Sequence, residues 1–203
     1  MKFSYAGAIA ALTLASALTA CGGKAQYTVQ GTIDGLTSSG LKLTNNGGDE
    51  ITVAAGATSF AFPKQIDYGT EYRIAITQDP EHMACQVAGD TGSAGYTVSI
   101  SAAISCSPLT YGLTGQYTGV TPNADGTVRT ITLINGSGGN IATITSASSS
   151  GNFAFTPIPY GAVYGVTVLP PTPGLNCTLQ NGTGVMRDTP ISNLLLTCVQ
   201  APT

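Results

Sequence analysis

Charged side chains are scarce in this chain. Asp, Glu, Lys and Arg make up 8% of its 203 residues and leave a formal net charge of −3, whereas soluble globular proteins carry about 25% charged residues. No basic run occurs, and the aromatic residues are not interleaved with Lys or Arg. Because a nucleic-acid interface needs clustered cations to neutralise phosphates, we expect no nucleic-acid partner.

Residue types that support catalysis or metal binding are also few. Trp is absent, and His82 is the only histidine. The sequence offers no supported Ser–His–Asp set, and no Gly-x-Ser-x-Gly or phosphate-binding loop occurs. After the N-terminal segment, no window carries the apolar stripe of an amphipathic helix. The sequence therefore predicts an all-β protein with no enzyme activity, no catalytic residue, no metal and no cofactor.

The first 20 residues have the three parts of a secretory signal. Met1 and Lys2 give a positive start, residues 3–18 are almost all apolar or small, and small residues precede Cys21. The apolar run is short and weakly hydrophobic for a transmembrane helix, which needs about 20 strongly apolar residues. The alternative is an ordinary signal peptide in which Cys21 stands by chance.

The segment Leu18–Cys21, with the sequence Leu-Thr-Ala-Cys, resembles the lipobox of bacterial lipoproteins. In that family the chain is cut just before the cysteine, which then carries acyl chains such as palmitate. The resemblance implies a signal peptide over 1–20, a lipidated Cys21, a tether over 21–25 and attachment to a membrane. Gly22 stands where many inner-membrane lipoproteins of Gram-negative bacteria have Asp. The resemblance therefore implies the outer membrane of the cell envelope, facing the periplasm or the cell surface.

An internal repeat fills the rest of the chain. At an offset of 92 residues, Tyr68 matches Tyr160. Further upstream, Tyr27 matches Tyr111 at a shorter offset, because the second copy carries extra residues around 122–127. The pair Phe-x-Phe occurs at 60–62 and again at 153–155. We expect one domain over 26–107 and a second over 108–200.

Alternating apolar residues predict short strands within each copy. Asn46-Gly47 lies between two such runs and is a strong hairpin signal, because both residues tolerate positive φ. Residues two apart share a face of a strand, so both Phe pairs are expected to fill cores. Further strands are expected at 72–76, 96–100, 131–133, 141–144, 164–168 and 191–199. About seven short strands in about 80 residues predict a β-sandwich.

The combination of Tyr27-x-Val-x-Gly31, the segment 40–49 and Phe-x-Phe resembles a repeat of bacterial cell-surface and secreted proteins. Those repeats are Ig-like sandwiches that occur in strings. The resemblance implies two tandem Ig-like domains that act as a stalk or presentation module, and it brings no catalytic residues.

Four cysteines remain once Cys21 is assigned to the lipid: Cys85, Cys106, Cys177 and Cys198. An even number in a secreted chain indicates disulfides. Zinc is the alternative, but no Cys-x-x-Cys occurs. Cys85 and Cys106 are 21 positions apart, as are Cys177 and Cys198, and the repeat maps the first pair onto the second. We therefore expect one bridge within each domain.

Loops are where the two copies differ most. Residues 79–82 gather two carboxylates with His82, whereas the second copy has a Pro-rich segment in that region and an insertion at 122–127. We interpret 79–82 as a solvated loop tip, not as a calcium or catalytic site. We expect a structural or adhesive role in which these loops contact an envelope protein or an extracellular ligand. The alternative is an accessory subunit that docks an envelope complex.

Overall fold

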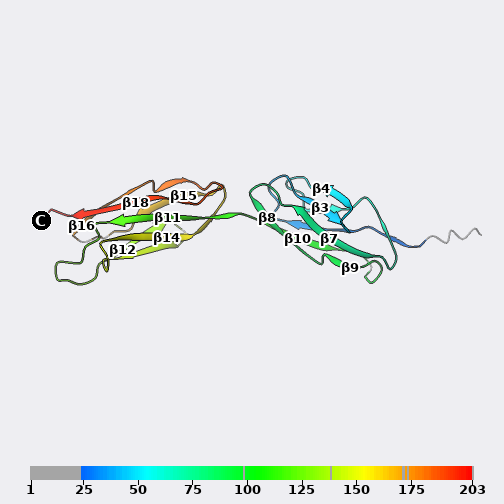
Figure 1. Ribbon diagram of the computed structural model, residues 1–203, viewed down its shortest axis with the longest axis horizontal. Helices are drawn as coiled ribbons and strands as arrows, with labels where there is room; N and C mark the ends of the chain where they lie inside the picture. The colour runs from blue at the N-terminus through cyan, green and yellow to red at the C-terminus, as the bar shows by residue number, and fades with distance from the viewer. Residues whose placement is uncertain (1–23, 98, 138, 171, 173, 203) are drawn as a thin grey trace, which may run out of the picture.

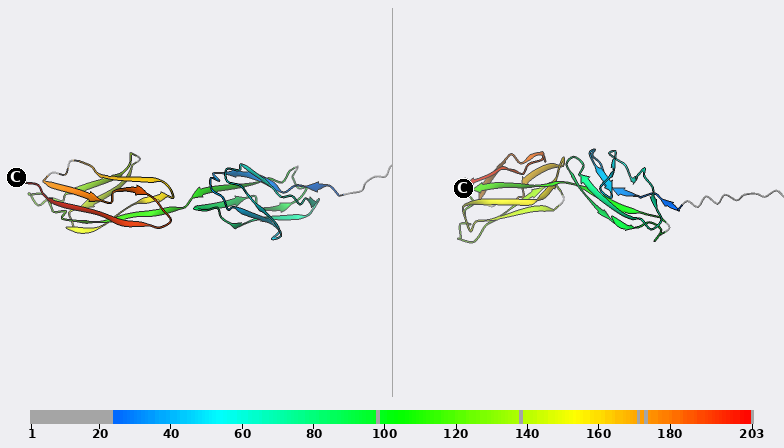
Figure 2. Two further views of the ribbon diagram at one scale, coloured as in Figure 1. Left: turned by 90° about the horizontal axis from the view of Figure 1, so that it is seen from above. Right: turned by 45° about the vertical axis from the view of Figure 1, so that its right-hand side comes forward.

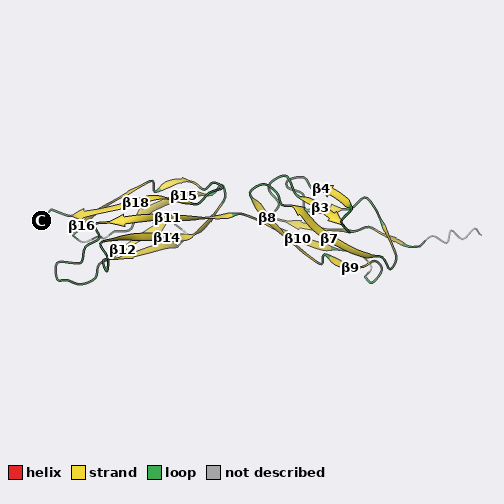
Figure 3. Cartoon of the chain, viewed as in Figure 1, coloured by secondary structure: helices red, strands yellow, loops and turns green. Residues whose placement is uncertain are grey.

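The computed structural model describes residues 24–97, 99–137, 139–170, 172 and 174–202. Within these residues the secondary structure consists of strands, and none is helical (Figure 3). Two β-sandwiches follow one another along the long axis (Figure 1). The predicted all-β fold with two tandem Ig-like sandwiches is confirmed. The predicted signal peptide and Cys21 lie outside the described residues.

The first sandwich packs two four-stranded sheets against each other. One sheet has the order β5 (Ser59–Ala61), β2 (Gln30–Asp34), β10 (Ala102–Pro108) and β8 (Met83–Ala88). The other has the order β4 (Asp49–Thr52), β3 (Lys42–Asn45), β7 (Glu71–Gln78) and β9 (Thr91–Ser93). A short pair, β1 (Gln26–Tyr27) with β6 (Ile66–Asp67), lies where the chain enters.

The second sandwich repeats this strand order. One sheet runs β14 (Ser150–Pro159), β11 (Thr110–Thr118), β18 (Ile191–Gln200) and β16 (Leu175–Gln180). The other runs β13 (Asn140–Thr145), β12 (Thr130–Asn135), β15 (Val163–Val168) and β17 (Thr183–Val185). In each sandwich an early strand pairs in parallel with the last one, β2 with β10 and β11 with β18. The end of β10 therefore leads directly into β11 of the next sandwich.

Each sandwich has a hydrophobic core of its own. Phe60 and Phe62 are both buried, with ring centroids 5.9 Å apart and planes at 85°. Phe153 and Phe155 repeat this edge-to-face contact at 6.0 Å and 87°. Edge-to-face contacts are a preferred aromatic geometry. The prediction that both pairs fill cores is confirmed.

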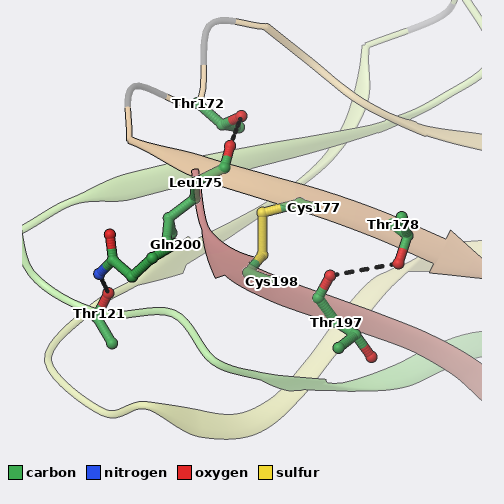
Figure 4. Close-up of a disulfide and its surroundings, with 8 residues drawn as sticks. All are labelled: Thr121, Thr172, Leu175, Cys177, Thr178, Thr197, Cys198 and Gln200. Atoms are coloured by element: carbon green, nitrogen blue, oxygen red, sulfur yellow. Dashed lines mark hydrogen bonds between the residues drawn. A yellow bond between two sulfur atoms is a disulfide. The ribbon is translucent and has the colours of Figure 1, made fainter. Parts of the chain in front are cut away.

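Both predicted disulfides are present, Cys85–Cys106 and Cys177–Cys198. Each joins residues that lie directly opposite each other on neighbouring antiparallel strands, β8 with β10 and β16 with β18. The second bridge lies near the end of β18, where the Gln200 amide donates a hydrogen bond to the Thr121 hydroxyl at 2.8 Å (Figure 4). Each bridge therefore fixes the last strand of its sandwich to its antiparallel neighbour.

The prediction of a strand over 96–100 is wrong, because the last strand of the first sandwich begins at Ala102. The Tyr96 amide donates to the Ser93 carbonyl at 3.3 Å, and the Thr97 hydroxyl donates to the Ser99 carbonyl at 2.8 Å. These local bonds make a turn in place of a ladder. In the sequence, apolar and polar residues alternate on both sides of this turn. The two-residue hydrophobic period alone therefore could not locate where β10 begins.

Two glycines of the second sandwich provide a matched test of backbone packing. Gly119 and Gly161 both have φ of +76°, but a Cβ at Gly119 would collide with the Cys198 carbonyl oxygen, whereas a Cβ at Gly161 meets nothing within 4 Å. A left-handed conformation costs an L-residue roughly 1–2 kcal/mol. We expect Gly161→Ala to lower the free energy of unfolding by about that amount, and Gly119→Ala by roughly 2 kcal/mol more. If Gly119→Ala and Gly161→Ala lower the urea unfolding midpoint equally, the close approach of Gly119 to the Cys198 carbonyl oxygen is contradicted.

Candidate functional site

The described surface has shallow grooves on the outer faces of the sheets. Two of them occupy equivalent positions in the repeats, with volumes of about 400 Å³ beside β2 and β5 and about 510 Å³ beside β11 and β14. They are lined by uncharged residues, which in the first sandwich are Gln30, Gly31, Thr32, Ser59, Phe60, Ala61 and Ser101. In the described part of the chain, no three His, Cys, Asp or Glu residues are placed to share a metal ion. Ring stacking and side-chain hydrogen bonds between segments far apart in the sequence occur instead at the ends of the sandwiches.

The junction between the sandwiches depends on one residue, Leu109, which separates β10 from β11. Its amide donates a hydrogen bond to the His82 carbonyl in the first sandwich at 2.9 Å. Its carbonyl accepts one from the Tyr160 amide in the second sandwich at 2.7 Å. The linker backbone is therefore bonded to both domains, which restricts rotation about it.

Side chains reinforce this junction. The His82 ring stacks on the Tyr160 ring with centroids 3.8 Å apart and planes at 13°. Nδ1 of His82 lies 2.7 Å from Oδ1 of Asp188, and the Tyr111 hydroxyl donates to the same oxygen at 3.4 Å. We call His82, Leu109, Tyr111, Tyr160 and Asp188 the junction cluster.

The pKa of Tyr111 is raised, first by partial removal of its hydroxyl from water and then by the negative charge of Asp188. Deprotonation would place a phenolate beside a carboxylate, and the two negative charges would repel each other. The hydroxyl therefore stays neutral and donates its hydrogen bond at neutral pH. Its contribution to the junction is present below the ordinary pKa of tyrosine and is lost as the pH rises through the raised value.

The interpretation of residues 79–82 as a solvated tip is wrong for His82. The His82 side chain is 34% exposed and contacts the second sandwich. Asp79 does not join this contact, since its carboxylate accepts a hydrogen bond from the Cys85 amide at 2.9 Å. The contact was missed because Asp188 lies 106 residues away in the sequence. The repeat offered no signal, since the residue that corresponds to His82 in the second copy is Gly174.

We expect His82→Asn to loosen the junction without disturbing the loop. His82 has φ of 59°, a left-handed conformation that Asn46 and Asn181 also adopt in this chain, so asparagine suits the backbone. The variant loses the ring stacking, which in aromatic pairs contributes about 0.5–1.5 kcal/mol.

The measurement is the distance between spin labels at Lys64→Cys and Val128→Cys, one exposed site in each sandwich. The distance distribution should broaden in His82→Asn and stay narrow in Asn181→His, a matched left-handed position elsewhere. An unchanged distribution in His82→Asn would show that the Leu109 backbone bonds alone fix the junction.

The far end of the second sandwich gathers the loops that differ between the repeats (Figure 2). The last strand holds two of them together: Gln200 bonds to Thr121, and the Ala201 amide donates to the Gly174 carbonyl at 3.0 Å. The segment around 119–129 and the described residues 169, 170, 172 and 174 therefore lie side by side at one tip, and they include most of the predicted binding residues. We call these two segments the distal loops.

Arg129 organises the distal loops, and sequence reasoning missed it. The residue is only 6% exposed, and its Nη2 donates to the Pro122 carbonyl at 3.2 Å. Its backbone amide donates to the Ser146 hydroxyl at 2.8 Å. The sequence around Arg129 alternates threonine with apolar residues and gave no signal of this role; the structure shows it, since buried arginines are almost always bound to partners.

The turn inside the longer distal loop is closed by its own side chains. Oδ1 of Asp125 accepts hydrogen bonds from the Thr127 hydroxyl at 2.6 Å and the Thr127 amide at 3.0 Å. These two donors, the hydroxyl first, lower the pKa of Asp125. The carboxylate is therefore charged at neutral pH, and the loop presents a fixed negative group at the tip.

No protein-family model matches the sequence, and no curated protein matches it. Among solved structures, the chain is similar to the Bacillus anthracis TIE protein, with 15% identity over 86% of this chain and 34% of that one, and a TM-score of 0.46. It is also similar to the T-13 major pilin of Streptococcus pyogenes (10% identity, 88% and 98% covered, TM-score 0.34). A third is the shaft pilin spaA of Lactobacillus rhamnosus GG (11% identity, 88% and 100% covered, TM-score 0.29). The chain spans about a third of the length of the Bacillus protein.

Proposed function

We propose that this protein is a lipid-anchored component of the bacterial cell envelope that holds the distal loops away from the membrane. The observation that carries the proposal is the junction. The Leu109 backbone and the stacked His82 and Tyr160 rings fix the two sandwiches end to end. The chain enters at β1 on one end and terminates at the other end, beside the distal loops (Figure 1, Figure 2).

The role is structural, or adhesive through the distal loops. None of the described residues forms a helix that is long and apolar enough to span a bilayer. We assign attachment at the outer membrane to an acylated Cys21, because Leu-Thr-Ala-Cys at 18–21 resembles a lipobox. Core strands must keep their packing, whereas loops on a rigid scaffold vary and carry recognition. The distal loops, held by Arg129 and the end of β18, are therefore the surface that we assign to a partner.

The experiment has two parts. First, the protein is purified from envelope fractions, and its N-terminal peptide is weighed by mass spectrometry; the expected peptide begins at Cys21 and carries acyl chains. An unmodified peptide that begins elsewhere would contradict the anchor. Second, protease treatment of whole cells reports which side of the membrane the distal loops face.

Partner binding is tested by replacing 122–127 with a short turn, while circular dichroism checks the fold. Loss of binding supports presentation by the distal loops. If binding survives this change but is lost when a sheet face is altered, the contact lies on the sheets. A stoichiometric envelope protein that remains bound through purification would favour an accessory subunit over an adhesin.

A further inference from the structure

The N-terminal end of the second sandwich is covered by the first sandwich, through the junction cluster. The same end of the first sandwich has the same backbone. The Tyr68 amide donates to the Ala25 carbonyl at 2.8 Å, as the Tyr160 amide donates to the Leu109 carbonyl at 2.7 Å. Gly69 and Gly161 make equivalent amide contacts, to Ala94 at 2.8 Å and to Met186 at 2.9 Å. The two ends are therefore copies of one docking platform.

The residues that form the platform differ at one position. Tyr27 and Tyr68 correspond to Tyr111 and Tyr160, but Tyr96 stands where the second sandwich has Asp188. We call Tyr27, Tyr68 and Tyr96 the tyrosine pole. The carboxylate that binds His82 in the second sandwich is thus replaced by a third aromatic ring, so this platform is not built for a histidine.

The tyrosine pole is open in the described chain. Tyr96 is 91% exposed and Tyr68 is 62% exposed, whereas Tyr160 is partly covered by His82. Tyr27 and Tyr68 pack together with ring centroids 6.4 Å apart. Clustered, exposed aromatic rings at the end of a domain mark an interaction surface.

We infer that the tyrosine pole rests in the headgroup region of the lipid bilayer. This inference rests on the proposed acylation of Cys21. Cys21 precedes Ala25 by four residues, and the Ala25 carbonyl is held by Tyr68. Four residues reach at most roughly 14 Å, so acyl chains on Cys21 bring the pole to the membrane surface.

The chemistry of the pole suits this site. Tyrosine is enriched at membrane–water interfaces, because its ring is apolar and its hydroxyl remains hydrated. Lys24 is exposed beside the pole and adds a positive charge that anionic headgroups attract. The lipid and the pole together form two points of attachment, which fix the tilt of the first sandwich relative to the membrane.

The chain contains no Trp, so one introduced indole reports on one position. We would reconstitute the lipidated protein as Tyr96→Trp in vesicles of phosphatidylethanolamine and phosphatidylglycerol, with and without bromine on the acyl chains. The matched control is Val128→Trp, at an apolar position within the distal loops that is 62% exposed. Flotation on a density gradient first establishes that both variants are membrane-bound.

With both variants floating, brominated lipid should quench most of the indole emission at position 96 and leave the emission at position 128 unchanged. Adding Tyr68→Ser to Tyr96→Trp should reduce the quenching, because the pole loses half of its exposed rings. Absence of quenching at position 96 in floating protein would overturn the inference and leave the anchor intact. Failure to float would instead overturn the anchor. Quenching that is equal at both positions would show that the protein lies flat, which also contradicts contact through the pole.

Discussion

Replacing Cys21 with serine should remove the protein from the membrane altogether. A single acyl chain binds a bilayer only marginally, whereas two or three chains make detachment negligible. Serine has no thiol to acylate, so Cys21→Ser should accumulate as an unprocessed precursor or in the soluble fraction. Membrane and soluble fractions, compared by immunoblot, measure the change.

Thr19→Ser is the control for this result, because it keeps a small residue inside the lipobox-like segment and leaves Cys21 in place. It should be processed and partition as the parent chain does. Normal maturation and unchanged membrane partitioning of Cys21→Ser would refute the lipoprotein interpretation and would leave an ordinary signal peptide in its place.

Removing the first disulfide should destabilise the first sandwich by about 2–5 kcal/mol, the usual cost in small secreted domains. The bridge closes a loop of about 20 residues, which contributes roughly 3 kcal/mol in the chain-entropy model. Both cysteines are changed together, as Cys85→Ala with Cys106→Ala, so that no free thiol remains. Urea unfolding of the oxidised protein measures the loss.

The second bridge supplies the matched control, as Cys177→Ala with Cys198→Ala. The two sandwiches have separate cores, so each double variant should lower the stability of its own sandwich and leave the other near its original midpoint. Residues 110–203 expressed alone should likewise fold. A single transition that shifts as a whole in both variants would show that the junction makes the two sandwiches one cooperative unit.

The sequence predicted the features that depend on neighbouring residues and the features that the internal repeat shows in both copies. Period-two alternation located the hairpin around Asn46 and the buried Phe pairs, because neighbouring residues alone decide which face of a strand they occupy. The disulfide pairing followed from duplication: one pair had to map onto the other. Acylation of Cys21 remains a prediction.

The features that the sequence did not predict depend on partners far away in the chain. Alternation could not separate the turn at Tyr96 from the strand that begins at Ala102. Nothing near His82 in the sequence indicates Tyr160 or Asp188, because that contact exists only once two folded sandwiches meet. Arg129 acquires its role in the same way, from loops that come together at the end of β18.

The parallel pairing of early and last strands has a mechanical consequence. In the first sandwich β2 and β10 lie side by side over Gly31–Asp34 and Ala102–Ser105. The chain passes from β1 into β2 and leaves the sandwich through β10. A pull on the two ends of this sandwich loads the ladder in shear, so its hydrogen bonds must break together and not one after another. The disulfide within each sandwich also limits how far the chain could lengthen if the ladder failed. The molecule is therefore suited to bear tension along its long axis.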